Sequence, residues 1–575
     1  MARILGVNLT QDASIAIIDT QEQSIIAVRK ERLNKIKHSW SELGDFTKYY
    51  SKLNEVWNKP FDLVVESYSS DPIRNKKNEI HKELNSFINF KTNPNFVEIS
   101  HHLAHLYSTL PIMTSNEAVG IVIDCMGSKK DIADQTQINI ETSSVNDVEI
   151  CSIYKVDKIG NFTIIGKQYW DGDWSKPVGL GTFYYLLTKC FYNAPGSEGK
   201  VMALASYGNS QKMNLPPLRI EDNYKVFIPD EWLKAFEDTE RFCFPKCNGN
   251  QLENIYNSKV NQPNLEKDSS DFQKNADLAA IGQKVFQDAL LKVILWVLKI
   301  TNTTEITFSG GTALNCVANG FLIKHIPTVK LSVPGHPDDG GTSIGAAIFG
   351  VKKLDVLQEI PVTKLNYWGV NNYLPNICLN QISMFKIEKH IDNSTLIKKV
   401  VRLIKKGFII GLYQGRSEFG PRALGNRTLL GDPRNVDVRD FINFRIKGRE
   451  WYRPVAPVIL EEYANDYFEI TQKSDYMQYA VDVKQSKIPS IPAVIHIDNT
   501  ARLQTLARAN NPFLYDLLVS FFKETGVPIL INTSLNMKGM PIIETPDEAI
   551  EMLVSTHMHA LIIDNTLIVK PNLKI

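Results

Sequence analysis

Three apolar segments that end in glycine-bearing turns constrain the fold of this 575-residue chain more than any other feature. They are LGVNLTQDAS (5–14), VIDCMGS (122–128) and TFSGGTALN (307–315). Each predicts a strand that ends with backbone amides at a turn, and the third also predicts a helix start, whose positive end favours a phosphate. Each alone is a weak signal, because glycine after a strand is usually only a turn. The sequence contains no GxxxxGKS or GxxxxGKT loop, which argues against a P-loop enzyme.

The remaining apolar pattern predicts a mixed α/β fold, because short strand-like runs alternate with segments of helical period. Further strands are expected at 14–19, 24–33, 62–67, 96–100 and 119–126, and helices at 181–193, 272–300, 313–324 and 342–352. After a weaker pattern over 353–366, a helix at 395–406 and a strand at 408–415 open a second α/β unit, which ends in strands at VPILINTS and ALIIDNTLIV. We therefore predict two domains, residues 1–355, with a polar insertion at about 209–270, and residues 366–575.

The composition excludes several classes of function. With 64 basic and 63 acidic side chains the formal net charge is +1, so the chain lacks the basic surplus of a nucleic-acid binder. Neither a secretory signal nor an uncharged run of membrane-spanning length is present. Of the seven cysteines only Cys243 and Cys247 lie close together, without the partners of a structural zinc site. We expect a cytoplasmic monomer or homodimer with no nucleic-acid or membrane partner.

Against this balanced charge, nine cations crowd between Arg416 and Arg453. A solvated basic face is the usual explanation of such a run. Here the cations alternate with apolar and turn residues, as in EFGPRALGNR (418–427) and REWYRPVAPVIL (449–460), so we expect them to point inward or to line loops beside a core. Guanidinium groups bind phosphate and carboxylate oxygens in a bidentate way. The tract therefore predicts a site for a small phosphorylated or acyl-phosphate substrate.

The motif HHLAH predicts a divalent metal site. It follows a predicted strand, and in a helix His101 and His105 would lie four residues apart on one face, within reach of one ion. Asp124 at a strand end, and Asp338 with Asp339 in a glycine-rich turn, could complete a mixed nitrogen and oxygen site. Iron, manganese, zinc and magnesium all stay open, although two imidazoles disfavour magnesium and calcium. The alternative is an ordinary polar helix start.

Several longer motifs together resemble the O-carbamoyltransferases of antibiotic and nodulation-factor biosynthesis. The resemblance covers nearly the whole chain through KERLNKIKH (30–38), HHLAH (101–105), GSEGKVMALASYG (196–208), SGGTALNCVANG (309–320), EFGPRALGNRTLLGDPR (418–434), KGREWYRPVAPVI (447–459), IPAVIHIDNTARLQT (491–505) and INTSLNMKGMPIIETP (531–546). It implies an amino-terminal domain of the actin-like ATPase fold, a duplicated ribonuclease H-like domain akin to the tRNA threonylcarbamoyl transferase Kae1. It also implies a carboxy-terminal domain similar to the carbamate-adenylating YrdC fold.

The reaction that this resemblance implies has two steps and uses carbamoyl phosphate and ATP, the latter with Mg²⁺. The carboxy-terminal domain forms carbamoyl adenylate and releases pyrophosphate. The amino-terminal domain then transfers the carbamoyl group to a hydroxyl of a small-molecule acceptor, a sugar or a natural product, and AMP leaves. The acceptor stays open, because variable loops line such pockets.

The same resemblance assigns roles to individual residues. The phosphates of carbamoyl phosphate and ATP are assigned to Arg422, Lys447, Arg449 and Arg453, whereas Arg427 and Arg434 are interpreted as structural. Further substrate contacts are assigned to His496, Arg502, Asn532 and Ser534. The metal, iron or another divalent ion, is assigned to His101, His105, Asp124 and Asp339. Nucleotide contacts in the amino-terminal domain are assigned to Lys200, Gly310, Gly311 and Asn315.

One position departs from the family's pattern. A His-Asp pair commonly precedes the DASAA-like run of this family, whereas this chain has Gln11 and Asp12 there. Glutamine cannot act as the base for an acceptor hydroxyl. Three alternatives stay open: Asp12 is the catalytic base, the metal lowers the pKa of the hydroxyl, or the transfer half has been altered or lost.

Three other functions compete with carbamoyl transfer. A small-molecule kinase would use the first domain but would leave the basic second domain without a task. Hydrogenase-maturation carbamoyltransferases share both folds, yet this chain lacks their paired CxxC zinc motifs. A non-catalytic nucleotide-sensing module would have no need of the predicted metal ligands.

Overall fold

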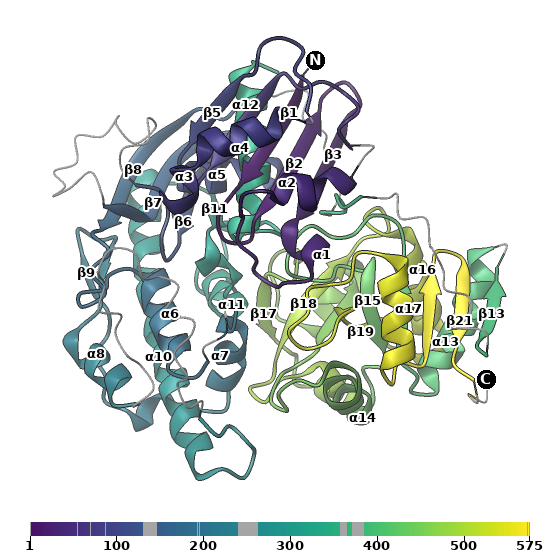
Figure 1. The fold of residues 1–575 in the computed structure, drawn as a ribbon. Helices are drawn as coiled ribbons and strands as arrows, with labels where there is room; N and C mark the ends of the chain where they lie inside the picture. Colours follow the sequence, from purple (N-terminus) through teal and green to yellow (C-terminus); the bar gives the residue numbers. More distant parts are fainter. Residues whose placement is uncertain are drawn as a thin grey trace. The chain divides into compact units, whose positions relative to one another are not determined.

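The computed structural model describes residues 2–53, 56–69, 71–86, 88–129, 147–192, 194, 196–239, 263–356, 365–370, 384–390, 392–571 and 573. The chain forms two compact units (Figure 1). The first consists of Met1–Ser24 and His38–Pro361, and the second of Ile25–Lys37 and Val362–Ile575. The second unit therefore contains most of strand β3 (Ser24–Arg29) and helix α1 (Lys30–Asn34), which come from near the N-terminus.

The two larger sheets of the first unit share one arrangement of four strands. The strands of the first sheet are β1 (Arg3–Asn8), β2 (Ser14–Asp19), β4 (Leu63–Ser67) and β5 (Phe96–Ile99). The corresponding strands of the second sheet are β6 (Glu117–Ile123), β7 (Val148–Asp157), β11 (Glu305–Ser309) and β12 (Lys330–Ser332). In each sheet the first strand pairs antiparallel with the second and parallel with the third, which pairs parallel with the fourth. Strand β8 (Phe162–Trp170) extends the second sheet beyond β7.

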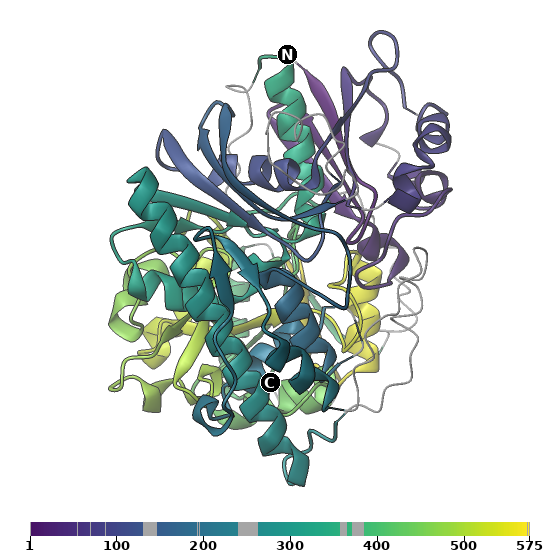
Figure 2. The ribbon, with the colours of Figure 1, turned by 90° about the vertical axis from the view of Figure 1, so that its left-hand side faces the viewer.

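Two helices that follow the last strands of these sheets pack on each other. Helix α5 (His101–Ser108) follows β5, and helix α12 (Thr342–Lys353) packs on α5 and on β1, β2 and β4. Figure 2 shows α12 in teal beside the purple strands of the first sheet. Glycine allows this close packing, because a Cβ atom at Gly345 would lie only 1.6 Å from the Ala104 carbonyl oxygen. The HHLAH helix is thereby held against the turn that precedes α12.

Further helices of the first unit lie in the connections between strands of the second sheet. They are α6 (Leu180–Lys189), α7 (Glu198–Ala205), α10 (Ser270–Thr301) and α11 (Cys316–His325). The helix expected at 313–324 begins later, because Gly311–Leu314 forms a 3-10 turn and Asn315 caps α11. Strands β7 and β8 were not expected from the apolar pattern.

The predicted polar insertion is folded over its described part. Residues 209–239 contain β9 (Arg219–Glu221), β10 (Lys225–Phe227) and α8 (Asp230–Glu237). Trp232 of α8 is fully buried, and its ring lies edge-on against Phe183 with centroids 4.9 Å apart. This part of the insertion therefore belongs to the core. Cys243 and Cys247 lie outside the described residues.

The second unit is built on one mixed sheet of nine described strands in the order β13-β21-β20-β14-β15-β19-β16-β18-β17. Their bounds are Lys386–Lys389 (β13), Ile410–Tyr413 (β14), Arg427–Gly431 (β15), Ala456–Leu460 (β16), Tyr479–Asp482 (β17), Thr500–Leu506 (β18), Ile529–Ser534 (β19), Ala560–Ile563 (β20) and Thr566–Val569 (β21). The ALIIDNTLIV segment, expected as one strand, is a hairpin that turns at Asp564, where φ is +49°.

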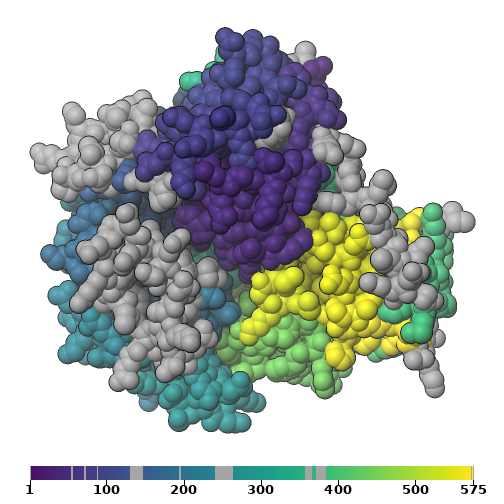
Figure 3. Space-filling model, viewed as in Figure 1, coloured from purple at the N-terminus to yellow at the C-terminus, as the bar shows by residue number. Residues whose placement is uncertain are grey.

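Strands from distant parts of this unit alternate in the sheet. In Figure 3 the green and yellow atoms of the unit adjoin on the face in view. Its main helices are α13 (Asn393–Lys405), α14 (Val436–Phe441), α16 (Pro512–Thr525) and α17 (Pro546–Ser555). The mixed α/β class predicted from the sequence is confirmed for both units. No described helix of the chain has the length and apolar character needed to cross a membrane.

Candidate metal centre and anion site

The start of helix α5 is fixed by three side-chain caps. Ser100 Oγ accepts a hydrogen bond from the Leu103 amide at 3.2 Å, Ser128 Oγ accepts from the first helical amide at 2.8 Å, and Glu149 Oε1 accepts from the second at 2.9 Å. These amides would otherwise lack partners at a helix start. The caps fix the direction in which the helix presents its histidines.

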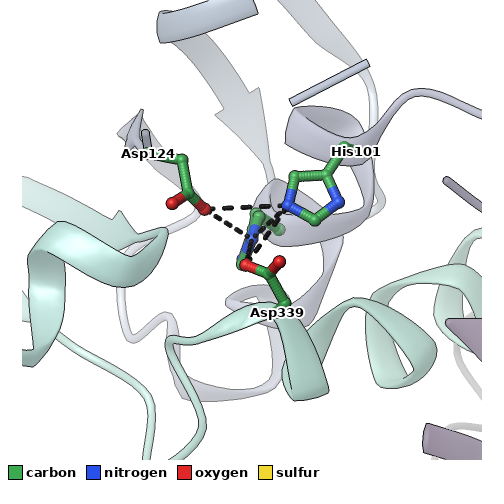
Figure 4. A group of neighbouring side chains, drawn as sticks. His101, Asp124 and Asp339 are labelled. Carbon is green, nitrogen blue, oxygen red and sulfur yellow. Dashed lines mark hydrogen bonds and ion pairs between the residues drawn. The ribbon is translucent and has the colours of Figure 1, made fainter. Parts of the chain in front are cut away.

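Four side chains from three segments of the first unit converge at this helix: His101, His105, Asp124 and Asp339. The two Nε2 atoms of the histidines are 3.1 Å apart. Their distances to Asp124 Oδ2 are 3.6 Å (His101) and 3.3 Å (His105), and to Asp339 Oδ1 3.4 and 3.7 Å. Figure 4 shows the carboxylates of Asp124 and Asp339 both directed toward His101. The structure therefore brings together all four residues predicted as metal ligands, with Asp339 and not Asp338 in the cluster.

The geometry of this cluster fits a divalent ion. Ligand atoms 2.0–2.2 Å from a shared ion lie about 2.8–3.6 Å from one another in tetrahedral or octahedral coordination. Four of the five distances above, 3.1 to 3.6 Å, lie in that range, and the fifth, 3.7 Å, lies just beyond it. Two imidazole nitrogens and two carboxylate oxygens suit iron, manganese or zinc.

The charges of the cluster also favour a cation at its centre. Burial by itself lowers the pKa of His101, but the Asp339 and Asp124 carboxylates outweigh burial and raise that pKa to about 10. Burial would raise the pKa of Asp124, yet His101 and His105 hold it well below its usual range. The carboxylates thus favour positive charge on the imidazoles, and a metal ion would satisfy the same preference.

Neighbouring groups orient the ligands. Ser309 Oγ lies 3.1 Å from His105 Nδ1, and the amides of Cys125 and Gly311 donate to the Asp124 carboxylate at 2.9 and 3.3 Å. Such outer contacts fix the tautomer and direction of metal ligands. Ser309 and Cys125 carry no sequence signal of this role.

Behind α5 lies a fully buried ion pair that the sequence did not predict. Lys167 Nζ donates to Glu149 Oε2 at 2.7 Å, and both side chains have no solvent exposure. Burial lowers the pKa of His102 to about 3. Burial would raise the pKa of Glu149, but His102 and Lys167 outweigh it and lower that pKa to about 2. This pair anchors the helix start through the Glu149 cap.

The predicted nucleotide contacts have structural partners of their own. Gly310 has φ +91°, and a Cβ atom there would lie 2.3 Å from the Ile123 carbonyl oxygen. The Asn315 side chain caps α11 by accepting from Ala318 N at 3.0 Å and exchanges hydrogen bonds with Gln283 at 3.1 and 3.2 Å. Lys200 Nζ lies 4.6 Å from the centre of the Tyr192 ring.

The cation tract of the second unit divides into two groups, and the arginines of the first group bind main-chain carbonyls or a neighbouring carboxylate. Arg416 donates to the carbonyls of Gly369 and Trp368 at 2.6 and 2.8 Å. Arg427, fully buried, donates to three carbonyls at 2.8 to 3.1 Å and stacks over the Tyr413 ring at 3.6 Å. Arg434 forms a bidentate pair with Asp432.

The second group concentrates positive charge around the π-helical turn Ile442–Lys447. Burial, and then the charges of Arg449, Arg453 and Lys37, lower the pKa of Lys447 well below its usual range. Burial, and then Arg453 and Arg502, lower the pKa of Arg449 in the same way. These mutual effects place the cations near one another, as an anion site requires.

Fixed partners position these cations. Lys447 Nζ donates to Ser534 O at 2.5 Å and to Asn536 Oδ1 at 2.8 Å. Arg449 Nε donates to Asn443 Oδ1 at 2.6 Å, and its terminal NH₂ donates to the Pro454 carbonyl at 3.0 Å. Asn443 and Asn536 were not predicted from the sequence.

The other predicted substrate contacts occupy different settings. Ser534 accompanies Lys447, whereas Asn532 is fully buried in strand β19, where it donates to Gln504 Oε1 at 2.6 Å. His496 Nε2 lies 3.2 Å from the Tyr452 carbonyl oxygen, and burial lowers the pKa of this histidine. Arg502 lies in β18.

Arg422 lies half-buried in a loop organised by a buried carboxylate. Glu418 Oε1 accepts hydrogen bonds from the amides of Leu424, Asn426 and Arg427 at 2.9, 2.7 and 3.2 Å. Three amides on one carboxylate oxygen hold the GPRALGNR loop in place. Glu418 was likewise not predicted as part of the site.

Comparison with known proteins links both units to one family. The family model of the carbamoyltransferase N-terminus matches residues 77–348, and that of the carbamoyltransferase C-terminus matches residues 401–570. The nodulation protein NolNO of Sinorhizobium fredii is 28% identical over 96% of this chain and 78% of its own length. The nodulation protein NolO of Bradyrhizobium diazoefficiens is 31% identical over 68% of this chain and 69% of its own length.

Among solved structures, full-length HypF in its phosphate- and nucleotide-bound form covers 62% of this chain and 56% of its own, at 13% identity and a TM-score of 0.37. The matches to the two carbamoyltransferase models and to the nodulation proteins carry the assignment. The chain belongs to the carbamoyltransferase family that includes the nodulation proteins NolNO and NolO.

Proposed function

We propose that the protein is an ATP-dependent O-carbamoyltransferase that works through carbamoyl adenylate and modifies a hydroxyl of a small-molecule acceptor, a sugar or a natural product. The observation that carries the proposal is the presence of two separate charge centres. A site of two histidines and two aspartates lies in the first unit, and a cluster of buried cations lies in the second. One centre suits a metal and a phosphate ester, and the other suits a polyphosphate.

The second unit would carry out adenylation. Water releases orthophosphate from carbamoyl phosphate to give carbamate, a carbamate oxygen attacks the α-phosphorus of ATP, and pyrophosphate leaves. Mg²⁺ would accompany ATP. Lys447, Arg449 and Arg453, with Arg422 and Arg502, would neutralise the charge that develops on the phosphates, which is the main task in phosphoryl chemistry.

The first unit would carry out the transfer. The acceptor hydroxyl loses its proton to Asp12, its oxygen bonds to the carbamoyl carbon, and the bond from that carbon to the phosphate oxygen breaks to release AMP. His101, His105, Asp124 and Asp339 would hold a divalent ion, with iron the first candidate. When bound, such an ion supplies a Lewis acid for the phosphate and carbonyl oxygens.

The proposed fold assignments follow the same division. The repeated arrangement of four strands in the first unit supports an actin-like, Kae1-like domain at residues 1–355. The mixed nine-stranded sheet supports a YrdC-like domain at residues 366–575. ATP and carbamoyl phosphate as substrates favour a cytoplasmic enzyme.

The test follows the phosphate products. With ATP, carbamoyl phosphate and a divalent ion, the purified protein should release orthophosphate and pyrophosphate, and AMP once an acceptor is present. ADP as the nucleotide product would indicate a kinase, and bound ATP without turnover would indicate a sensor. Mass spectrometry should show the acceptor gaining about 43 Da, the mass of CONH₂ in place of hydrogen.

Two variants test the division of labour. Arg449→Ala should abolish pyrophosphate formation, because it removes a cation beside Lys447 and Arg453. His105→Ala should leave pyrophosphate formation intact and impair transfer. Arg508→Ala, which removes an exposed arginine paired with Asp516, is the matched control and should change neither rate. The reverse pattern for Arg449 and His105 would overturn the assignment of the two units.

A further inference from the structure

Asp12 has a histidine partner from another part of the first unit. His38 Nδ1 lies 2.9 Å from Asp12 Oδ1, and the carboxyl is 95% buried. A backbone hydrogen bond from Ala13 N to Ser39 O, at 3.0 Å, joins the residues that follow the two members of the pair. The side-chain contact is therefore held by the main chain as well.

The pair is tied to the candidate metal centre. The buried Asn8 side chain donates from Nδ2 to the carbonyls of Asp339 at 2.9 Å, Gln11 at 2.8 Å and Asp12 at 3.3 Å. Ser14 Oγ donates to the Gly340 carbonyl at 2.8 Å. The loop that carries Asp12 is thus joined by hydrogen bonds to the turn that carries the predicted metal ligand Asp339.

The backbone around the pair is strained. Asp12 has φ +52° and His38 has φ +55°, both in the left-handed region that side chains disfavour. Gly196, with φ +68°, makes room for the imidazole, because a Cβ atom there would lie 1.9 Å from His38 Nε2. Conformations of this kind cluster at functional sites.

We propose that His38 is the positioning residue for Asp12 in carbamoyl transfer, an inference that rests on the proposed function of the first unit. His38 donates its Nδ1 proton to Asp12 Oδ1, and Asp12 Oδ2 receives the proton of the acceptor hydroxyl. That proton ends on Oδ2, the hydroxyl oxygen bonds to the carbamoyl carbon, and AMP leaves with the electron pair of the broken bond.

The chemical consequence is a dependence on the protonation of His38. An imidazolium ion beside Asp12 makes the carboxylate a weaker base, so transfer should slow at low pH as His38 becomes charged. If the contact between Asp12 and His38 only joined two loops, the rate of transfer would not fall at low pH as His38 becomes charged.

The experiment measures AMP release with water as the acceptor, and pyrophosphate exchange in the same preparations. His38→Asn keeps an N–H donor near the position of Nδ1 and tolerates a positive φ, but it cannot titrate. We expect it to retain most of the AMP release rate and to lose the acidic limb. His38→Ala should lower AMP release about 10- to 100-fold with exchange unchanged. His81→Asn is the matched control, since His81 Nε2 lies 2.8 Å from Glu66 in the same unit, and its profile should equal the wild-type profile.

The outcomes separate this inference from the proposed function. If the wild-type protein shows no pyrophosphate exchange that depends on carbamoyl phosphate, the proposed function is wrong. If the wild-type protein is active and His38→Asn has the same pH profile of AMP release, only the role of His38 is wrong. The same conclusion follows if both His38 variants lose pyrophosphate exchange and AMP release to the same extent. If AMP release to water is too slow to follow, the titration of His38 measured by ¹⁵N NMR decides. The midpoint of this titration must differ between the wild-type protein and Asp12→Asn, and equal midpoints would overturn the pairing.

Discussion

At the scale of single residues, this protein places charged side chains out of water and pairs each with a specific partner. Glu149 and Lys167 illustrate the energetic cost of burying charge, because both are fully buried beside the helix that carries the metal ligands. Breaking such a pair by removing one partner leaves an uncompensated buried charge.

Lys167→Met should therefore lower the free energy of unfolding of the first unit by about 3 to 5 kcal/mol, measured by denaturant titration. It should also weaken divalent metal binding, because Glu149 caps the helix that begins at His101. Lys155→Met removes a lysine from an exposed pair with Glu117 in the same sheet and should change stability by less than about 1 kcal/mol. Equal effects of the two variants would contradict the anchoring role of Lys167.

Lys447 offers a second test at this scale. Burial and three neighbouring cations depress its pKa, and a bound polyphosphate would raise that pKa again. Between the depressed pKa and the raised one, binding of pyrophosphate should take up protons. Calorimetry in two buffers of different ionisation enthalpy measures this uptake, and Lys447→Met should abolish it. Proton uptake that is as large in Lys447→Met as in the wild-type protein would contradict the prediction.

At the scale of elements, the contact between α5 and α12 sets the metal centre. A Cβ atom at Gly345 would meet the Ala104 carbonyl at 1.6 Å, and backbone cannot move aside as a side chain can. Gly345→Ala should therefore push the two helices apart, lower the free energy of unfolding by about 1 to 3 kcal/mol and reduce the affinity for a divalent metal. Gly199→Ala in helix α7 is the matched control, because only Met202 Cε lies within 4 Å and alanine favours helix. Thermal unfolding and metal titration compare the two.

The elements also explain how far the sequence could predict this structure. The helix pairing of His101 and His105 follows from a period of four residues, and long apolar runs predict most strands and α10. Strands β7 and β8 were not predicted, although polar residues such as Lys155 stand between apolar ones along β7, as expected for a half-buried strand.

Contacts between distant segments could not be predicted. Asp12 and His38 are 26 residues apart and Lys447 and Ser534 are 87 apart, so only the folded loops bring them together. The cation tract shows the same limit, because Arg416 and Arg427 donate to main-chain carbonyls of loop residues such as Gly369 and Gly415. Which carbonyls lie within reach of an arginine is a property of the fold and leaves no periodic trace in the sequence.

At the scale of the whole molecule, the second unit depends on a segment from near the N-terminus. Arg32 of that segment is buried and donates to the carbonyls of Ile542 and Gly420 at 3.1 Å each. Arg32→Met should lower the stability of the second unit by about 2 to 4 kcal/mol, because several carbonyls lose a charged donor. Hydrogen exchange should show faster opening in residues 392–571 and not in 263–356. Lys59→Met, at an exposed pair with Glu22, is the control and should alter neither region.

The discontinuous second unit has a consequence for how the polypeptide is made. Residues 25–37 leave the ribosome long before strands β14 to β21 exist, so they must wait through the synthesis of more than half of the protein before their partners arrive. No single cut in the gene can separate the two units into halves that each fold complete. A natural or engineered fission would have to carry a second copy of this segment, and a split gene that lacks one should yield an insoluble carboxy-terminal product.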